Sequence, residues 1–225
     1  MGIPKPTAER LARLAQLLEQ RQNRTVPVTS TEIEQLTGWA SHTIRKDISL
    51  LGAGNTIAGS TGYDPERLSR AIRESLGFTG ESRNCCIVGL GRLGSAFLEY
   101  SGFYGSHFTL CAGFDSNVNR VEILKADFPL FPSYKMKEVI PRMGIRYAIL
   151  AVPPSQAVQT AEKLVECGIT GIVNFTPVIL PLPHTVEVEQ VSVIDALSKL
   201  AARLAVTQHH AAASDTTQAD ENTKE

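Results

Sequence analysis

The sequence of 225 residues lacks the long apolar segments that mark membrane and secreted proteins. No apolar stretch reaches the roughly 18 residues that a membrane-spanning helix needs, and residues 1–13 contain no apolar signal core. This absence argues against a membrane-spanning helix. We therefore expect a cytoplasmic protein with no membrane partner.

Cysteine is also scarce, and its spacing is not that of a metal or redox site. Cys85, Cys86, Cys111 and Cys167 form no Cys-x-x-Cys pair, and three of them lie in apolar runs that are typical of buried strands. Four of the five histidines, at positions 107, 184, 209 and 210, are too scattered to form a metal site with one another. The sequence therefore predicts reduced core thiols and no metal.

The length and the charge distribution favour two domains. A chain of 225 residues exceeds the usual single domain of about 100 to 150 residues. Residues 1–78 carry 10 Lys and Arg against 8 Asp and Glu, whereas the remainder carries 12 against 15. The first part is therefore slightly basic and the second slightly acidic, which is weak support for nucleic-acid binding by the first part.

The first 79 residues are predicted to form a small helical domain. Leucines recur at helical spacing over Thr7–Arg21, and Thr29 with Glu32 forms a capping box for a second helix. Residues 37–40 make the turn, and Ser41 is predicted to be the N-cap of a third helix, with Ile44, Ile48 and Leu51 facing inward. Residues 52–63 suit a hairpin or wing, and Asp64-Pro65 begins a fourth helix.

This order of elements has the proportions of a DNA-binding helix-turn-helix. The outer face of the third helix carries the residue types that contact phosphates and base edges in a major groove. The candidate DNA-binding residues are Ser41, His42, Thr43, Arg45 and Lys46.

After a polar linker at residues 80–83, short apolar runs alternate with helical segments, which predicts a Rossmann-like, doubly wound parallel sheet. The predicted strands are Asn84–Val88, Thr109–Phe114, Tyr147–Val152, Gly171–Phe175 and Thr185–Val188. The predicted helices are Arg92–Tyr100, Tyr134–Met143, Ser155–Gly168 and Val193–Val206. The tail at 208–225 has almost no large apolar residue, so it is predicted to be disordered. The fold class is α/β, with the winged helix-turn-helix first.

The sharpest motif is a glycine loop placed between a buried strand and a helix. Its residues are Gly89, Leu90, Gly91, Arg92, Leu93 and Gly94. In this context the first glycine permits a tight turn, the second lets a pyrophosphate approach, and the third allows close helix–strand packing. Asp115 ends the next strand, where it can accept hydrogen bonds from the adenosine ribose and repel a 2′-phosphate. The pattern predicts NAD⁺ and NADH as ligands and favours them over NADP(H).

Two further segments are predicted to lie at the carboxyl ends of strands, where open parallel sheets bind their ligands. They contribute Val152 and Pro153 from one strand end and Asn174 and Thr176 from another. We expect these residues to line the nicotinamide half of the site, although each proline could merely end its strand.

Taken together, these segments resemble the Rex family of redox-sensing transcriptional repressors from about Ile3 to Val206. The resemblance rests on Ile3-Pro4-Lys5, Val28-Thr29-Ser30, Ser41–Asp47, the glycine loop, Phe114-Asp115, Val152-Pro153 and Asn174–Pro177. It implies a homodimer that binds a palindromic operator and releases it when NADH rises. It also implies that a helix at 191–207 is exchanged between subunits, after a winged-helix domain at 1–79 and an NAD(H)-binding domain at 80–190.

The chain departs from the family pattern at two places. The expected wing, residues 54–62, has no positive charge, whereas the family usually has a basic stretch there. The family also couples a tyrosine, matched by Tyr100, to an arginine and an aspartate, and those two positions are Gln16 and Ser192 here. Arg13 and Asp195 lie about one turn away from them. These changes bear on DNA contacts by the wing and on the link between the two domains.

Two other functions remain open at this point. A small NAD-dependent dehydrogenase would use the same glycine loop, but the sequence has no Tyr-x-x-x-Lys pair and no substrate domain after residue 206. A dinucleotide-binding module that contacts protein rather than DNA would also fit the neutral wing. We predict no catalytic residue and a repressor rather than an enzyme.

Overall fold

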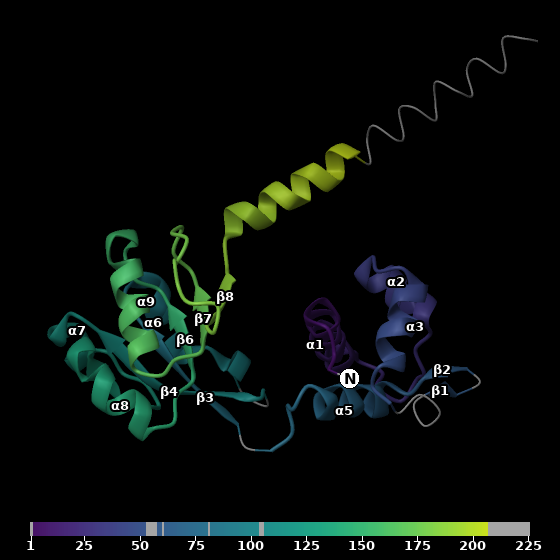
Figure 1. Ribbon diagram of the computed structural model, residues 1–225, viewed down its shortest axis with the longest axis horizontal. Helices are drawn as coiled ribbons and strands as arrows, with labels where there is room; N and C mark the ends of the chain where they lie inside the picture. Colours follow the sequence, from purple (N-terminus) through teal and green to yellow (C-terminus); the bar gives the residue numbers. More distant parts are fainter. Residues whose placement is uncertain (1, 53–57, 60, 81, 104–105, 207–225) are drawn as a thin grey trace, which may run out of the picture. The chain divides into compact units, whose positions relative to one another are not determined.

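The computed structural model describes residues 2–52, 58–59, 61–80, 82–103 and 106–206. The chain folds as two compact units, Met1–Glu81 and Ser82–Glu225, and Figure 1 labels most of their helices and strands. The predicted disordered tail at 208–225 lies outside the described residues, as does most of the predicted wing tip.

The first unit is a helical domain with a short hairpin. Its elements are α1 (Lys5–Gln20), α2 (Ser30–Thr37), α3 (Ser41–Ser49), β1 (Ala58–Gly59), β2 (Gly62–Tyr63) and α5 (Pro65–Ser75). The inward faces of the four helices form one core with Val28, whose backbone pairs with Tyr63. The periodicity of the apolar residues therefore predicts the packing of this unit correctly.

The predicted caps of the helices are confirmed in two places and wrong in one. The Thr29 hydroxyl accepts from the Glu32 backbone N–H at 3.1 Å, and the Glu32 carboxylate accepts from the Thr29 N–H at 2.7 Å. Asp64 is the N-cap of α5, which agrees with the predicted helix start at Asp64-Pro65, and its carboxylate accepts from the N–H groups of Glu66 and Arg67, both at 3.0 Å. Ser41, however, is the first residue of α3, and its N–H donates to the Glu34 carboxylate at 3.3 Å. A carboxylate from α2 thus satisfies the helix start, so no serine cap is required.

The second unit contains a parallel sheet of six strands in the order β5-β4-β3-β6-β7-β8. The strands are β3 (Arg83–Val88), β4 (Phe108–Asp115), β5 (Leu130–Pro132), β6 (Tyr147–Leu150), β7 (Gly171–Asn174) and β8 (Glu187–Gln190). From central β3 the chain first builds outward through β4 and β5, and then crosses over to β6, β7 and β8. The order therefore reverses between β3 and β6, and ligands of doubly wound sheets bind at such a switch point.

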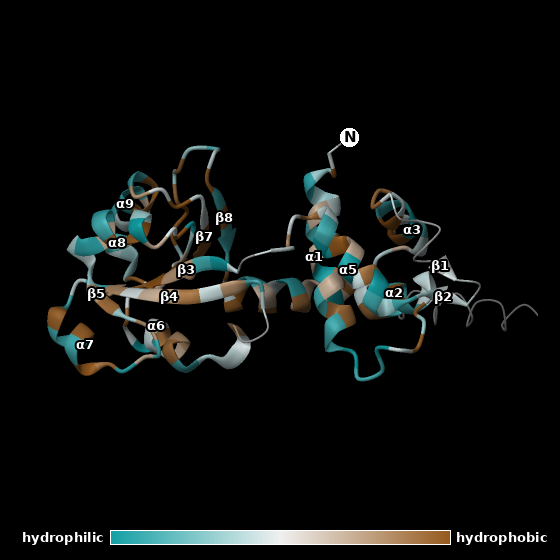
Figure 2. Ribbon diagram, turned by 90° about the horizontal axis from the view of Figure 1, so that it is seen from below, coloured by the Kyte–Doolittle hydropathy of each residue, from teal (hydrophilic) through white to brown (hydrophobic). Residues whose placement is uncertain are grey.

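Helices cover both faces of this sheet, as Figure 2 shows. They are α6 (Arg92–Ala96), α7 (Val118–Ile123), α8 (Met136–Arg142) and α9 (Ala157–Glu166), with short 3-10 turns η1 (Phe97–Glu99), η2 (Ser101–Phe103), η3 (Ser133–Lys135) and η4 (Pro154–Gln156). Helices α8 and α9 pack on one face, and α6, η1 and α7 lie on the other. The predicted Rossmann-like α/β fold is confirmed.

Local boundaries differ from the predictions where a helix changes type or an element is short. The predicted helix Arg92–Tyr100 is α-helical only to Ala96 and continues as a 3-10 turn. The short elements β5 and α7 have too few residues to show a periodicity, and they were not predicted. Residues 193–206 are helical as expected, and all of their side chains are exposed, including Leu197, Leu200 and Leu204 at 55%, 46% and 55%.

Candidate functional site

The glycine loop follows β3 directly, and two of its three glycines lie where a side chain would clash with nearby backbone atoms. Gly89 has φ +91°, and a Cβ there would lie 2.5 Å from the Ala151 carbonyl oxygen. A Cβ at Gly94 would overlap the carbonyl oxygen of Gly89. The loop is therefore pressed between β6 and the start of α6, as close helix–strand packing requires.

Gly91 is different, because no residue that the structure describes requires a glycine there. Its φ is −69°, which any residue adopts, and a Cβ built on it would meet no atom of the described residues within 4 Å. It is also the N-cap of α6, so the backbone N–H groups that follow it have no helical partners. Open space beside free N–H groups at a helix start is what a pyrophosphate needs, so the loop fits a dinucleotide.

A cavity of about 570 Å³ opens at this loop, at the carboxyl ends of the strands. Six residues predicted for the cofactor site line it: Gly89, Gly91, Leu93, Asp115, Val152 and Pro153. The strand-end argument thus brings together residues from β3, β4 and β6 that are up to 64 positions apart in the sequence.

The remaining predicted cofactor residues do not line this cavity. The Leu90 side chain is buried in the core, Arg92 points to solvent, and Gly94 is covered by Gly89. Asn174 and Thr176 are buried as well. The Asn174 amide oxygen accepts from the N–H and hydroxyl of Thr176 at 3.0 and 2.8 Å, and its NH₂ group donates to Val178 and Gln190, both at 2.8 Å. Their polar groups hold the turn after β7, and Phe175 between them reaches the cavity.

Several lining residues escaped the sequence analysis because they come from helix faces. The side wall formed by η3, α8, η4 and α9 contributes Ser133, Met136, Gln156, Gln159, Thr160 and Lys163. These residues show no motif in the sequence, and their selection depends on how α8 and α9 pack on the sheet. Arg120 on α7 is a further lining residue that was not predicted.

Asp115 lies at the mouth of the glycine loop and is only 4% exposed. One carboxylate oxygen accepts from the Leu90 N–H at 2.6 Å and from the Arg120 guanidinium at 3.1 Å, and the other accepts from the Asn117 N–H at 2.7 Å. The side chain therefore fixes the loop to the end of β4, a role that the sequence did not indicate. Three of the roughly four acceptor positions of the carboxylate are already used.

The thiols lie in the sheet and its covering helices rather than in the site. Burial, followed by the neighbouring Cys111, raises the pKa of Cys85 to about 12, and burial also raises the pKa of Cys86, Cys111 and Cys167. All four are free thiols. Among the described residues no group of His, Cys, Asp and Glu could hold a metal ion, and no helix there is long and apolar enough to cross a bilayer.

The predicted DNA-binding residues lie on α3. His42, Arg45 and Lys46 are exposed, while Ser41 and Thr43 are half-buried. Arg45 donates to the Ser30 hydroxyl at 3.2 Å, which holds its guanidinium between the starts of α2 and α3. In the described part of the wing, Ala58–Gly59 pairs with Gly62–Tyr63.

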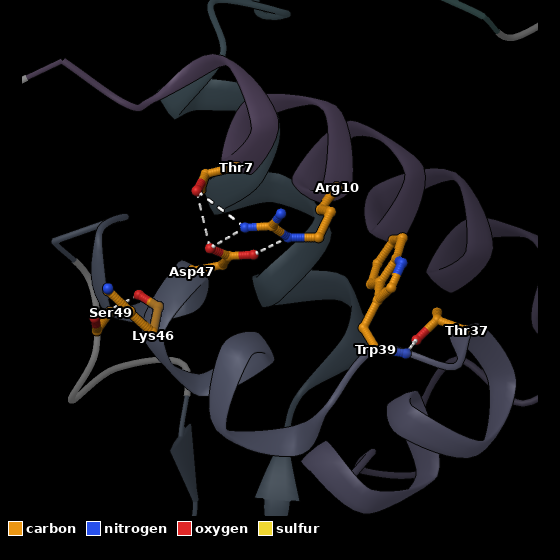
Figure 3. Close-up of polar contacts among 7 residues, drawn as sticks. All are labelled: Thr7, Arg10, Thr37, Trp39, Lys46, Asp47 and Ser49. Carbon is orange, nitrogen blue, oxygen red and sulfur yellow. Dashed lines mark hydrogen bonds and ion pairs between the residues drawn. The ribbon is translucent and has the colours of Figure 1, made fainter.

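A buried polar cluster anchors α3 to α1, and sequence analysis missed it. The Asp47 carboxylate accepts from Arg10 Nε at 2.6 Å, from Arg10 Nη2 at 2.9 Å and from the Thr7 hydroxyl at 3.0 Å (Figure 3). Asp47 and Thr7 are 5% and 6% exposed. Because Asp47 follows Lys46 in α3, these three bonds fix the helix whose outer face carries the candidate DNA contacts.

The residues of the expected link between the domains are found in different units. In the first unit Arg13 donates to Gln16 at 3.3 Å. In the second, Tyr100 is 56% exposed and makes edge contacts with Phe97 and Phe103. The Ser192 hydroxyl accepts from the Asp195 N–H at 3.1 Å, and Asp195 pairs with Lys199 at 2.7 Å. The coupling itself stays a prediction.

Two family profiles match the chain. One, described as "Putative DNA-binding protein N-terminus", covers residues 2–49, and one described as "CoA binding domain" covers residues 80–178. The first contains α1 to α3 and the second contains the glycine loop and most of the sheet. Each profile thus falls on one of the two sites described above.

Relatives match across both units. The chain is 34% identical over 201 residues to "Redox-sensing transcriptional repressor Rex" of Streptomyces coelicolor, covering 89% of this chain and 77% of that protein. It is 33% identical over 202 residues to the protein of the same name from Limosilactobacillus fermentum, covering 88% and 91%.

Solved structures agree with these relatives. The chain is similar to RSP, "a Rex-family repressor", with a TM-score of 0.76 and 30% identity, over 92% of this chain and 97% of that one. RSP is also known in complex with β-NADH, with a TM-score of 0.77 and 29% identity over 92% and 97%. A third structure of RSP, with β-NAD⁺ and operator DNA, gives 0.76 and 31% over 93% and 96%.

Proposed function

The chain belongs to the Rex family of redox-sensing transcriptional repressors, and we propose that it binds operator DNA through α3 and releases it when NADH occupies the cavity at the glycine loop. The observation that carries the proposal is the open space at Gly91. Gly89 and Gly94 are required by the fold, whereas the absence of a side chain at Gly91 serves only something that approaches the loop from outside.

The cavity offers a place for each part of a nicotinamide dinucleotide. The N–H groups at the start of α6 suit the pyrophosphate. Val152, Pro153 and Phe175, at the ends of β6 and β7, give the apolar surface that a nicotinamide ring needs, and Asp115 with Ser116 lies at the end of β4, where the adenosine ribose binds in such folds. The ring is charged and planar when oxidised and neutral when reduced, and this difference is the signal that the pocket distinguishes.

DNA binding is assigned to the exposed face of α3. Arg45 and Lys46 supply positive charge, and His42 and Thr43 supply groups able to reach base edges. Ser41, at the first turn, suits a phosphate contact. The described part of the wing carries no basic residue, so we assign the phosphate contacts of this surface to Arg45 and Lys46 on α3.

The regulated species is proposed to be a cytoplasmic homodimer. A palindromic operator requires two recognition helices at half-sites one or more DNA turns apart. The helix at 193–206 exposes Leu197, Leu200 and Leu204, which lie on one face at spacings of three and four residues. Such a face in a lone chain calls for a partner, and exchange of this helix between subunits buries it.

Regulation follows if the two redox forms favour different dimer shapes. A ligand moves a conformational equilibrium only through its different affinity for the two states. If NADH favours the shape in which the recognition helices no longer match the half-sites, operator affinity falls as the NADH/NAD⁺ ratio rises. The matching relatives are named as repressors, which speaks against the dehydrogenase alternative.

Fluorescence anisotropy tests the proposal. A labelled palindromic operator, selected from random DNA with the purified protein, is titrated with NADH against an NAD⁺ background. We expect salt-dependent binding that NADH abolishes in the wild type, whereas Gly91→Ala keeps DNA binding and needs at least about tenfold more NADH for release. Lys163→Ala, in the side wall of the cavity on α9, gives a second probe of the same site.

Two results would contradict this function. A Gly91→Ala variant that no longer binds NADH, yet still releases DNA when NADH is added, excludes the cavity as the sensor. Arg45→Ala and Lys46→Ala remove positive charge from α3. If neither the DNA affinity nor its salt dependence changes in these variants, α3 is excluded as the DNA-binding surface, and a module that contacts protein is favoured.

A further inference from the structure

We propose that Phe97 is a positioning residue, which transmits occupation of the cavity from Phe175 in its wall to Tyr100 at the surface of the second unit. NADH needs this contact in order to release DNA. The inference rests on the proposed function, because it names the side chains by which the signal leaves the cavity.

The first step is the cavity wall at Phe175, at the end of β7. Phe175 lines the cavity, whereas its neighbours Asn174 and Thr176 are buried. The Asn174 side-chain oxygen accepts from the N–H and the hydroxyl of Thr176 at 3.0 and 2.8 Å. The Phe175 N–H also donates to the Leu150 carbonyl at 3.0 Å. The backbone of this turn is therefore fixed on both sides, so a ligand that presses on the wall displaces the Phe175 ring and not the turn.

The second step is Phe97, which contacts both Phe175 and Tyr100. Its ring centroid lies 5.5 Å from that of Phe175 at an interplanar angle of 62°, and 5.9 Å from that of Tyr100 at 73°. Phe97 belongs to η1 and packs, half-buried, against the core on this face of the sheet. Because protein interiors are close-packed and edge contacts have preferred geometries, a new position of the Phe175 ring requires a new position of Phe97.

The third step is the outer end of these contacts, at Tyr100. Its ring makes an edge contact with Phe103 at 5.7 Å and 88°, in addition to the contact with Phe97. A Cβ on Gly102 would overlap the Tyr100 ring, so the ring rests directly against the backbone of η2 (Ser101–Phe103). Tyr100 is nevertheless 56% exposed. A displacement that begins in the cavity is therefore presented at the surface of this unit by the Tyr100 ring.

A competing role for Phe97 is simple packing, and Phe108 provides the comparison. Phe108 is also half-buried and packs against the same core, and it makes an edge contact with Tyr147 at 5.3 Å and 87°. Its ring contact does not involve Phe175 or Tyr100. If both phenylalanines only fill space, replacing either of them by leucine has the same effect on the protein.

The test measures the coupling ratio of the full-length protein, which is the operator Kd in saturating NADH divided by the operator Kd without dinucleotide. We expect Phe97→Leu to lower this ratio at least about threefold, and to change the NADH affinity of the DNA-free protein by less than about threefold. Linkage requires operator DNA to weaken NADH binding by the same ratio. Titration of NADH into the operator complex should therefore give the same lowered value, which a loss of stability alone would not produce.

Two further variants act as a second perturbation and a control. Gly102→Ala displaces the Tyr100 ring without touching the cavity wall, so we expect it to lower the coupling ratio as well. Phe108→Leu is the matched control, and we expect it to leave the ratio unchanged.

The outcomes separate this inference from the function on which it rests. An unchanged coupling ratio in Phe97→Leu overturns the inference alone, and so does an equal decrease in Phe97→Leu and Phe108→Leu, which assigns the packing role. A loss of NADH affinity of more than about tenfold in DNA-free Phe97→Leu also overturns it, because Phe97 then acts in binding. If the wild type binds NADH with no change in its operator affinity, the proposed function fails along with the inference.

Discussion

The bonds between Asp47 and α1 lead to a prediction in which stability and DNA binding change together while ligand binding does not. We consider Asp47→Asn, which keeps the size of the side chain and one oxygen for Thr7 but removes the negative charge. Three hydrogen bonds of 2.6 to 3.0 Å converge on this carboxylate, two of them from Arg10. The variant leaves the guanidinium without its counter-ion.

The magnitude follows from the burial of the two partners. Removing one member of a fully buried ion pair lowers the free energy of unfolding by about 3 to 5 kcal/mol. The Asp47 side chain is 7% exposed, but that of Arg10 is 29% exposed and can regain some hydration. We therefore expect a loss of about 2 to 3 kcal/mol, which is a substantial part of the roughly 5 to 15 kcal/mol typical of a domain.

The single tryptophan makes the measurement specific to the first unit. Trp39 packs against the core formed by α1, α2, α3 and α5, so its fluorescence during urea unfolding reports on this unit alone. The matched control is Arg67→Gln, which removes an exposed pair with Asp64 at 3.6 Å. Its expected effect is below about 0.5 kcal/mol.

The functional consequence concerns the orientation of α3. Under conditions where the variant is still folded, we expect Asp47→Asn to weaken operator binding by about tenfold, since ordering the helix on DNA now opposes binding by about 1 kcal/mol or more. The affinity for NADH should stay unchanged, because the cavity belongs to the other unit. Weakened NADH binding would mean that the substitution disturbs more than the anchoring of α3.

A double-mutant cycle with Arg10→Gln decides whether the two side chains act as a pair. We expect a coupling free energy of at least about 1 kcal/mol. The reasoning is refuted if the midpoint of unfolding of Asp47→Asn equals that of the wild type, or if the effects of the two substitutions simply add.

Three further predictions follow from the second unit. Gly89→Ala and Gly94→Ala should each lower the free energy of unfolding of the second unit by about 2 kcal/mol or more, whereas Gly91→Ala should change it by less than about 1 kcal/mol. Circular dichroism during urea unfolding measures these differences. Equal losses at all three positions would remove the argument for a ligand at Gly91. Because the pKa of Cys85 is raised from 9.0 to about 12, the folded state disfavours the thiolate, so its contribution to stability is complete below about pH 9 and is lost as the pH rises toward 12. Cys85 should accordingly resist a thiol reagent at pH 8 until the protein is unfolded, and rapid labelling of the native protein would contradict its burial. If the proposed homodimer forms through the helix at 193–206, Leu200→Asp on its exposed apolar face should give a monomer in sedimentation experiments without unfolding the sheet. A variant that sediments as the wild type does would contradict this subunit contact.

The sequence was sufficient for features that depend on local periodicity and on residues near one another in the chain. The spacing of leucines and isoleucines predicted α1, α2 and α3, and Thr29 with Glu32 marked the start of α2. The alternation of apolar runs and helices, with the glycine loop after β3, was sufficient for a Rossmann-like sheet. These patterns can be read without the tertiary structure, because burying one face of a helix or strand requires apolar residues at regular spacings along the sequence.

The tertiary structure alone decided which side chains meet across long separations. In the sequence, nothing distinguishes Asp47 from the other polar residues of α3. In the structure, the packing of α1 on α3 brings the Arg10 guanidinium to its carboxylate. Asp115 matched a ribose-binding acid in sequence, but the fold brings Leu90 and Arg120 to its oxygens and leaves little of its charge to the cavity. Sequence spacing carries no record of such contacts, since whether a charge is free or neutralised depends on the groups that packing places within about 3 Å of it.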